Sequence, residues 1–237
     1  MFERTEILVG KQGLEKLFSS RVAVMGVGGV GAYALEMLVR AGIGNIVIVD
    51  SDVVGLSNKN RQLLAMDSTI GKPKVEVARQ RALDINPNLN LRCISEYITE
   101  ENIEDLMAQV GDVDFLVDAI DTLSPKLALI TYCVKNKIPL VASMGAGAKY
   151  DATKVRIADL SKSFNCPLAY IVRKKLRKAG IYKGFPVVFS EELPDENAIV
   201  PCQERNKKSQ VGTISYLPAV FGCVAAQAVI TALLKQE

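Results

Sequence analysis

The sequence contains no histidine, and this absence excludes a large group of catalytic mechanisms. Without imidazole the chain supplies neither a histidine base nor a histidine metal ligand, so Ser-His-Asp and Cys-His nucleophilic systems within the chain are excluded. Cysteine is scarce and forms no CxxC pair, which argues against a four-thiolate zinc site and, in a cytoplasmic protein, against structural disulfides. The five cysteines are Cys93, Cys133, Cys166, Cys202 and Cys223.

Net charge is also small, at +3, so any indication of a nucleic-acid partner must be local. Low-complexity segments and internal repeats are absent, and a chain of 237 residues with 49% hydrophobic residues is long enough for one domain with a substantial core. An uninterrupted apolar signal segment is missing too, because Glu3, Arg4 and Glu6 break up the first residues. We therefore expect a cytoplasmic protein.

One long apolar run does occur, from Tyr216 to Leu234. Its length is close to that of a membrane span. Four residues interrupt it, namely Pro218, Gly222, Gln227 and Thr231. We therefore favour a buried or interface helix over stable membrane insertion.

Apolar segments alternate with segments of helical period, a pattern typical of a mostly parallel sheet with helices on both faces. Strands are predicted over 21–26, 45–50, 90–95, 113–118 and 139–143, and helices over 29–42, 73–86, 101–109 and 124–137. The rhythm changes after residue 150, where we predict a strand over 154–159, a basic helix over 167–179, a strand over 185–190, a long loop over 191–212 and a helix over 218–234. The predicted fold is α/β and Rossmann-like, with a C-terminal α+β extension.

The stretch GVGGVG forms a glycine-rich turn between the first strand and the next helix. Gly26 permits a tight turn, Gly28 lets a phosphate approach the backbone, and Gly31 allows close packing of helix on strand. Gly29 lies in the same turn, whose N–H groups can bind an anion. Asp50, at the end of the next strand, can accept hydrogen bonds from a ribose diol. These features together predict a nucleotide site. Because this glycine motif occurs most often in proteins that bind NAD or FAD, the motif alone favours one of those two cofactors.

The residues after Asp50 point instead to a nucleotide with a longer phosphate chain. Asn58 and Arg61 lie in the stretch SNKNRQ, and Lys74 lies at the start of the next predicted helix. The planar fork of Arg61 and the point charge of Lys74 suit the β- and γ-phosphates of a triphosphate. Either cation could equally be a solvated surface charge.

Two carboxylates follow the strand in VDFLVDAID, at the edge of the sheet where open α/β folds bind ligands. A carboxylate beside nucleotide phosphates implies a bound cation, most simply Mg²⁺, and we assign that role to Asp121 rather than to Asp118. The alternative is that Asp121 caps the helix that begins near Ser124.

The first 150 residues resemble the ThiF/MoeB-like relatives of the ubiquitin-activating enzymes. The matching segments are ERTEIL, GVGGVG, VDSDVVGLSNKNRQ, GKPKVE, INPN and VDAID. The resemblance implies that a carboxylate attacks the α-phosphorus of ATP, releasing pyrophosphate and leaving an acyl-adenylate. It also implies that the turn from Gly26 to Gly31, together with Asp50, Asn58, Arg61 and Lys74, holds ATP.

Further roles also follow from this resemblance alone. Asp121 would lie by the α-phosphate and its Mg²⁺, with a monovalent cation, Na⁺ or K⁺, as a further expectation. Arg4 would reach the triphosphate bound to the neighbouring subunit of a homodimer. From the residues alone, Arg4 is only a charge close to the start of the chain.

The second half resembles one subfamily in particular. The stretch CPLAYIVRKKLRK…VVFSEELP is similar to the signature of the tRNA threonylcarbamoyladenosine dehydratases, in which aspartate is usual at the position of Cys166. This resemblance implies adenylation of the threonylcarbamoyl carboxylate next to the anticodon, then cyclisation with loss of AMP. We expect one adenylation domain over 1–237, with ATP bound by 1–150 and substrate binding and dimerisation assigned to 151–237.

The basic cluster of the second half suits this partner. An amphipathic helix with Ile171, Val172 and Leu176 as its apolar positions would turn its cations outward, where they can neutralise tRNA phosphates. The predicted tRNA-binding residues are Arg173, Lys174, Lys175, Arg177 and Lys178. The plainer interpretation is a solvated face, because we count no interleaved aromatic residues for base stacking.

The sequence leaves the role of Cys202 and three rival functions open. Cys202 lies roughly where related enzymes have an acyl-accepting cysteine, yet an acyl-adenylate consumed within its own substrate needs no thioester. Adenylation of a sulfur-carrier protein, with a sulfur-transfer partner, is disfavoured by the missing zinc cysteines. An NAD-dependent oxidoreductase would leave Arg61 and Lys74 unexplained. A non-catalytic nucleotide-binding partner is the third alternative.

Overall fold

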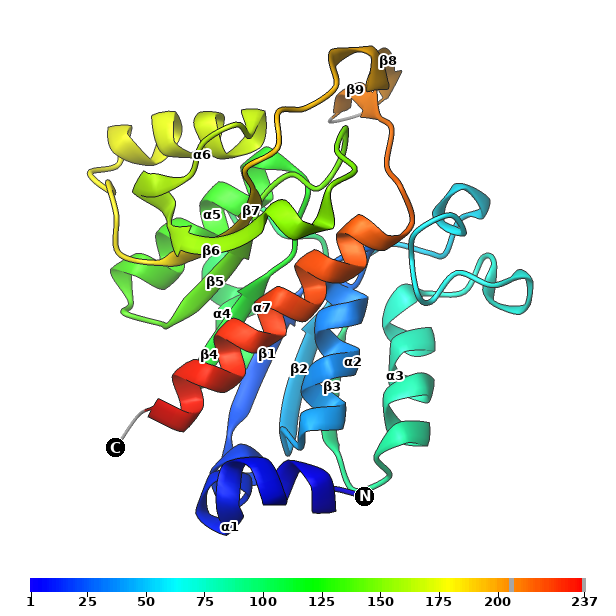
Figure 1. Cartoon of the computed structure of the whole chain (residues 1–237), viewed down its shortest axis with the longest axis vertical. Coiled ribbons are helices and arrows are strands. Elements are labelled where there is room, and N and C mark those ends of the chain that lie inside the picture. Colours follow the sequence, from blue (N-terminus) through cyan, green and yellow to red (C-terminus); the bar gives the residue numbers. More distant parts are fainter. Residues whose placement is uncertain (205–206, 236–237) are drawn as a thin grey trace.

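A seven-stranded sheet in the order β3-β2-β1-β4-β5-β7-β6 forms the centre of the molecule (Figure 1). The computed structural model describes residues 1–204 and 207–235, and only the backbone of 202–204 and 207–209. Neighbouring strands run parallel, except that β6 pairs antiparallel with β7. The strands of this sheet are β1 (Arg21–Met25), β2 (Asn45–Val49), β3 (Asn90–Ile94), β4 (Phe115–Asp118), β5 (Leu140–Ser143), β6 (Val155–Asp159) and β7 (Pro186–Ser190). The prediction of a Rossmann-like α/β fold is confirmed.

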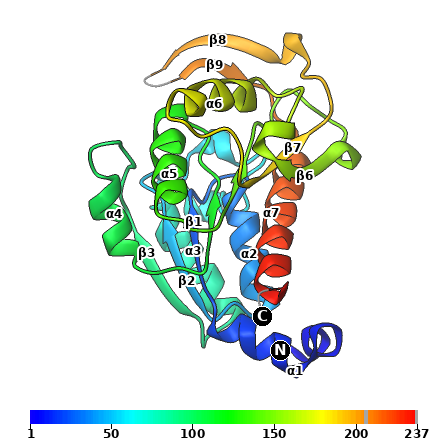
Figure 2. The ribbon, with the colours of Figure 1, turned by 90° about the vertical axis from the view of Figure 1, so that its left-hand side faces the viewer.

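Helices cover both faces of the sheet, as Figure 2 shows from the side. The helices are α1 (Glu3–Ser19), α2 (Gly31–Ala41), α3 (Lys74–Ile85), α4 (Ile103–Val110), α5 (Leu123–Lys135), α6 (Pro167–Lys178) and α7 (Tyr216–Lys235). One hydrophobic core contains buried residues of α2, α3 and α7, and a second contains those of α4, α5 and α6. The predicted strands and helices up to residue 190 match the observed ones to within about two residues.

The central strands are apolar throughout because each contributes side chains to both cores. In β1, Val22 and Val24 lie in the core under α2, whereas Ala23 and Met25 lie in the core under α5. This alternation follows from the two-residue period of a strand. A strand that is covered on both faces therefore reads as a continuous hydrophobic run.

The apolar helix α7 lies on the sheet. By length and composition it could cross a membrane, yet half of the residues in its most apolar window are buried. A side chain at Gly222 would clash with the backbone oxygen of Val30 and with Tyr33, so glycine permits close contact between α7 and α2. The prediction of a buried or interface helix agrees with this packing.

Two parts of the chain differ from the prediction. Helix α1 was not predicted, and only its second half contributes buried side chains, Leu14 and Leu17. The expected loop over 191–212 is wrong, because it contains the antiparallel hairpin of β8 (Ile199–Glu204) and β9 (Lys207–Val211). Helix α1 and the hairpin each leave large apolar side chains exposed, such as Leu8 and Val200. The apolar residues of these two segments therefore do not follow the regular spacing that marks a buried helix or strand.

The hairpin and α1 lie at opposite ends of the molecule (Figures 1 and 2). Because α1 leads directly into β1, it lies at the amino end of the parallel strands. The hairpin lies toward their carboxyl ends, which is the edge where open α/β sheets bind ligands.

Candidate functional site: a nucleotide site at the carboxyl edge of the sheet

The glycine turn after β1 has the geometry of an anion-binding loop. Gly26 adopts a φ of +89°, a conformation that favours glycine, and a side chain at Gly31 would fall 1.8 Å from the Gly26 oxygen. In the described chain, the backbone N–H groups of Gly28, Gly29 and Val30 donate to no protein acceptor. These groups precede the first turn of α2, where unpaired N–H groups and the helix dipole favour a phosphate.

Asp50 closes this turn from the end of β2. Its Oδ2 accepts a hydrogen bond from the N–H of Val27 at 2.7 Å, and its Oδ1 accepts one from the N–H of Asp52 at 2.8 Å. Burial raises the pKa of Asp50, while Lys74 and the two backbone donors act in the opposite direction. Each carboxylate oxygen keeps a second lone pair, so Asp50 can still accept from ribose hydroxyls.

The loop after β2 brings Asn58, Arg61 and Gln62 beside the glycine turn. Asn58 Oδ1 accepts from the N–H of Gly55 at 3.0 Å, which fixes the loop rather than leaving this atom for a ligand. Gln62 lies next to Gly28, and its Oε1 is buried without a hydrogen-bond partner among the described residues. Because an unpaired buried acceptor is costly, the Gln62 oxygen points to a ligand that supplies a donor.

Arg61 is connected to the base of the hairpin through Asn60. Arg61 Nη1 donates to Asn60 Oδ1 at 2.8 Å, and Asn60 Nδ2 donates to the carbonyl oxygen of Thr213 at 3.0 Å. A cavity of about 230 Å³ lies here, lined by Ala148, Lys149, Tyr150, Ala198, Gly212, Thr213 and Ile214. The Asn60–Thr213 hydrogen bond therefore joins the loop that holds Arg61 to a residue that lines this cavity.

Lys74 is the first residue of α3, and its side chain is almost wholly buried. Nζ lies 2.7 Å from Oδ2 of Asp52, whose own side chain is mostly exposed. The backbone N–H of Lys74 also donates to the Asp52 oxygen at 2.9 Å. Asp52, to which the sequence assigned no role, is thus the carboxylate that pairs with this cation.

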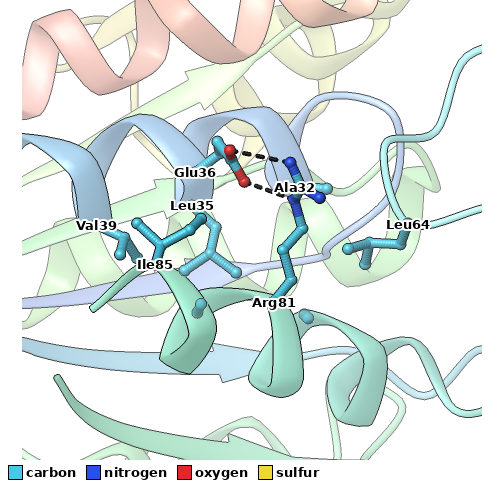
Figure 3. A pocket seen from close by; sticks show the side chains of 9 residues that line it. Ala32, Leu35, Glu36, Val39, Leu64, Arg81 and Ile85 are labelled. Carbon is cyan, nitrogen blue, oxygen red and sulfur yellow. Dashed lines mark hydrogen bonds and ion pairs between the residues drawn. The ribbon is translucent and has the colours of Figure 1, made fainter. Parts of the chain in front are cut away.

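A fork between Glu36 and Arg81 fixes α3 against α2, as Figure 3 shows. Arg81 Nε and Nη2 lie 2.7 and 3.1 Å from the two carboxylate oxygens, and Arg40 adds a further ion pair at 2.7 Å. Burial alone would raise the pKa of Glu36, but hydrogen bonds from the two arginines outweigh it and lower that pKa. The glycine turn and Lys74, at the N-termini of these two helices, are therefore held in fixed relation.

The turn after β4 rests on a buried ion pair. Lys126 Nζ lies 2.6 Å from Asp118 Oδ2, and Asp118 Oδ1 accepts from the N–H of Ile120 at 3.1 Å. Asp121 is exposed just beyond this turn, and the N-cap position of α5 is Thr122. The two aspartates of VDAID thus differ in environment, since Asp118 is internal and Asp121 faces solvent.

The donor set around Asp121 fits a metal only together with a nucleotide. Among the described residues, no three cysteine or acidic side chains gather as a metal site. Mg²⁺ in nucleotide sites commonly uses one or two carboxylates, with substrate phosphates and waters as its other ligands. Asp121 would suit such a site, and its role stays a prediction.

The basic helix forms as predicted, but two of its side chains differ from the prediction. Arg173 turns back to the segment before α6, where Nη1 donates to the Ser163 oxygen at 2.7 Å. Ile171 is partly exposed, and Ala169 instead joins Val172 and Leu176 on the buried face. The remaining predicted cations, Lys174, Lys175, Arg177 and Lys178, are exposed.

Of the remaining predicted site residues, one lies far from this edge and the other lies on the hairpin at this end of the molecule. Arg4 is exposed on α1, at the opposite end of the molecule from the glycine turn. From this position Arg4 can reach a nucleotide only in the site of a second copy of the chain, so that role stays a prediction. Cys202 lies on β8, and its side chain is outside the described residues, so its role stays a prediction.

Comparison with known proteins agrees with this geometry. The sequence model of the ThiF family matches residues 2–237. The chain belongs to the ThiF family. Within that family, it is 43% identical to the tRNA threonylcarbamoyladenosine dehydratase of Bacillus subtilis, over 99% of this chain and 94% of the relative.

A crystal structure of the tRNA N6-threonylcarbamoyladenosine dehydratase of Escherichia coli in complex with ATP is similar throughout. It has a TM-score of 0.90 and 34% sequence identity, and the match covers 98% of this chain and 93% of that one. The molybdopterin-synthase adenylyltransferase of Escherichia coli is more distant, at 33% identity over 65% of this chain and 61% of its own length. The similarity to the dehydratases therefore covers nearly the whole chain, whereas the match to that adenylyltransferase covers about two thirds of it.

Proposed function

We propose that this protein is an ATP-dependent tRNA threonylcarbamoyladenosine dehydratase. The proposal rests on the observation that three features lie at one edge of the sheet. They are the glycine turn, the buried Lys74 at the N-terminus of α3, and the guanidinium fork of Arg61 nearby. Helix α6, which carries the exposed cations Lys174, Lys175, Arg177 and Lys178, lies toward the same end of the molecule (Figure 1). The similarity to dehydratases over nearly the whole chain supports the choice of substrate.

The residues suit adenylation of a carboxylate. The N–H groups of the glycine turn would hold phosphate oxygens, Asp50 the ribose, and Arg61 with Lys74 the outer phosphates. The substrate carboxylate attacks the α-phosphorus, pyrophosphate leaves with the bonding electrons, and an acyl-adenylate forms. Such a step needs positioning and charge stabilisation more than a base, so a chain without histidine can perform it.

The second step would be cyclisation within the threonylcarbamoyl group. An internal nucleophile attacks the activated carbonyl and AMP leaves with one oxygen of the former carboxylate, so that the net change is loss of water. The cavity is lined by Thr213, whose carbonyl oxygen accepts from Asn60 of the Arg61 loop, and it is of a size to admit part of the modified nucleoside. No thioester on Cys202 is required by this sequence of bonds.

Further parts of the proposal concern ions, subunits and the division of the chain. Mg²⁺ would bind Asp121 and the phosphates, and would neutralise charge on the nucleotide. Residues 1–150 would bind ATP, and 151–237 would bind tRNA and contribute to a homodimer in which Arg4 reaches the other subunit's nucleotide. We further propose that Lys174, Lys175, Arg177 and Lys178 contact tRNA phosphates.

The decisive experiment measures AMP and pyrophosphate formed from ATP. We expect AMP with tRNA carrying threonylcarbamoyladenosine, and none with unmodified tRNA or with sulfur-carrier proteins. Substitutions Arg61→Ala and Lys74→Ala should each slow AMP formation at least about a hundredfold, the cost of one lost charge-stabilising group in a transition state. Arg79→Ala, an exposed cation further along α3, is the matched control and should leave the rate unchanged.

Two results would contradict the proposal. Absence of AMP with the modified tRNA would exclude the dehydratase function, and AMP with a carrier protein alone would favour the sulfur-carrier alternative. Near-normal turnover by the Arg61 and Lys74 variants would show that the phosphates bind elsewhere.

A further inference from the structure

The chain segment around α6 has a strong local charge. Between residues 160 and 190 there are seven lysines and arginines and no aspartate or glutamate. Because the whole chain carries +3, the remainder carries a net −4. A polyanion is therefore attracted to this segment in preference to the rest of the surface.

An exposed tyrosine lies in the first half of this basic helix. Tyr170 is 60% exposed, whereas its neighbours Ala169 and Val172 are wholly buried. Residues four and seven positions apart share one face of a helix, so Tyr170 lies in line with the exposed cations Lys174 and Arg177. The ring of Tyr170 therefore lies at one end of a line of exposed basic side chains.

A second exposed tyrosine lies just past the other end of α6. The N–H of Ile181 donates to the Leu176 oxygen, and Gly180 adopts a φ of +78°, so the chain turns sharply after the helix. Ile181 is buried by this turn, while Tyr182 is 62% exposed. The basic residues of α6 are therefore bounded by an exposed ring at each end.

The location of α6 suits a role in substrate binding. In Figures 1 and 2, α6 lies at the end of the molecule that carries the β8–β9 hairpin, and α1 lies at the opposite end. This is the end toward which the parallel strands run and where the nucleotide site lies. An RNA held along α6 would therefore be near the chemistry.

We propose that Tyr170 and Tyr182 are stacking platforms for unpaired bases of an RNA loop, with the cations between them on the adjoining phosphates. The inference rests on the proposed function and deepens it, because it specifies single-stranded nucleotides as the part of the tRNA that α6 binds. Aromatic rings recognise unstacked bases, which a paired helix does not present. Basic side chains alone would bind paired and unpaired RNA alike.

The test measures affinity of the full chain, without ATP, for an anticodon stem-loop and for a fully paired RNA duplex of equal length. We expect Tyr170→Ala and Tyr182→Ala each to weaken stem-loop binding about tenfold, with duplex binding unchanged. Tyr170→Phe and Tyr182→Phe retain the rings and should restore wild-type affinity. Tyr97→Ala is the matched control. Tyr97 is also exposed, but it follows β3, which is the edge strand at the other side of the sheet from β6.

Salt dependence separates stacking from phosphate contact. Lys174→Ala and Arg177→Ala should each reduce the slope of log affinity against log salt by about 0.7, the value for one phosphate contact on a single strand. The tyrosine variants should lower affinity with the slope unchanged. If the tyrosine variants also reduced the slope of log affinity against log salt, the substitutions would be acting by displacing the cations. That result would overturn stacking.

The outcomes also separate this inference from the proposed function. Wild-type protein that binds the stem-loop through the tyrosines but forms no AMP with modified tRNA would retain the inference and refute the dehydratase. Alanine variants within about twofold of wild type, or equal losses on stem-loop and duplex, would refute stacking while leaving adenylation intact. No measurable stem-loop binding by wild type would also refute it.

Discussion

Lys126 and Asp118 form an ion pair with 2.6 Å between Nζ and Oδ2, and neither side chain exposes any surface to solvent. Burial raises the pKa of Asp118, while Lys126 and the N–H of Ile120 favour its charged form. Burial and the Asp118 carboxylate also raise the pKa of the Cys133 thiol to about 12, so this cysteine stays protonated. The pair supports the turn that leads to Asp121, directly beside the glycine turn.

Removing one partner of this pair should be strongly destabilising. We expect Lys126→Met to lower the free energy of unfolding by about 3–5 kcal/mol, because Asp118 would remain as a buried unpaired carboxylate. The double substitution Asp118→Asn with Lys126→Met removes both charges and keeps an acceptor for Ile120, so it should recover most of the loss. Urea unfolding of the single and double variants measures this coupling.

An exposed pair provides the control for the buried one. Lys11 and Glu15 lie 4.0 Å apart on α1 with most of their surface in solvent. Lys11→Met should therefore cost less than about 1 kcal/mol. Additive losses in the double variant at Asp118 and Lys126 would show that the two charges do not stabilise each other.

Asp52→Asn should make stability depend more strongly on ATP. Without nucleotide, the buried Lys74 loses its carboxylate partner, and we expect the melting temperature to fall by roughly 2–4 °C, or about 1 kcal/mol for a pair whose acid is largely solvated. Bound phosphates replace that carboxylate, so saturating ATP should raise the melting temperature of the variant more than that of wild type. Thermal unfolding with and without ATP measures the difference.

The pair of Lys59 and Asp67 is the matched control for this experiment. It has the same 2.7 Å separation but involves no group at the glycine turn. Asp67→Asn should leave the ATP-dependent increase in melting temperature unchanged. An equal increase in wild type and in Asp52→Asn would mean that Lys74 does not meet the phosphates.

Acid should loosen the connection between α2 and α3. The pKa of Glu36 is lowered in the folded state, so its contribution to stability is present above the unfolded value of 4.5 and is lost as pH falls through the folded value. Glu36→Gln should cost about 1–2 kcal/mol near neutral pH, because two arginines lose a charged acceptor. Below pH 4.5 the stabilities of variant and wild type should converge, and a constant difference across the acid range would contradict the assignment.

Cys166→Asp should stabilise the fold. Cys166 is the N-cap residue of α6, and its Sγ accepts a weak bond from the N–H of Ala169 at 3.5 Å. Burial lowers the pKa of the nearby Lys149, and Cys166 and Glu192 oppose that shift. A carboxylate at position 166 would cap the helix and attract Lys149, for a gain of about 1 kcal/mol in thermal unfolding.

Asparagine separates the two contributions at this position. Cys166→Asn supplies the cap without the charge and should give a smaller gain than aspartate. If asparagine and aspartate are equal, Lys149 does not interact with the cap residue. If both variants are less stable than wild type, the buried site does not accept a polar cap.

Most of the sheet was predictable because its strands and helices have distinct apolar periods. Val22 to Met25 are buried on both faces of β1, and Val75, Ala78 and Ala82 mark the inner face of α3. Helix α1 and the β8–β9 hairpin were missed because their apolar residues are partly exposed and follow neither period. Local sequence therefore predicted the elements that supply most of the two cores and missed α1, which adds only Leu17 to a core, and the hairpin.

The site was predictable where a residue type is demanded by backbone geometry. Gly26 and Gly31 occupy positions that a side chain would strain or block, so their spacing carries a reliable signal. Pairings between distant residues left no such signal: Asp52 with Lys74, or Asn60 with Thr213, depends on how loops fold back. Tyr170 was passed over because a tyrosine in a helix resembles a core residue until its exposure is known.

The distance between α1 and the glycine turn has a genetic consequence. If Arg4 completes the nucleotide site of a second copy, each site is built from two polypeptides. Two substitutions on different chains of one dimer can then both fall in the same site and leave the other site intact. Chains with Arg4→Ala and chains with Lys74→Ala, each inactive alone, would then form mixed dimers with one intact site. Co-expression of the two defective alleles would restore part of the activity, whereas two alleles altered at Lys74 and Arg61 would restore none.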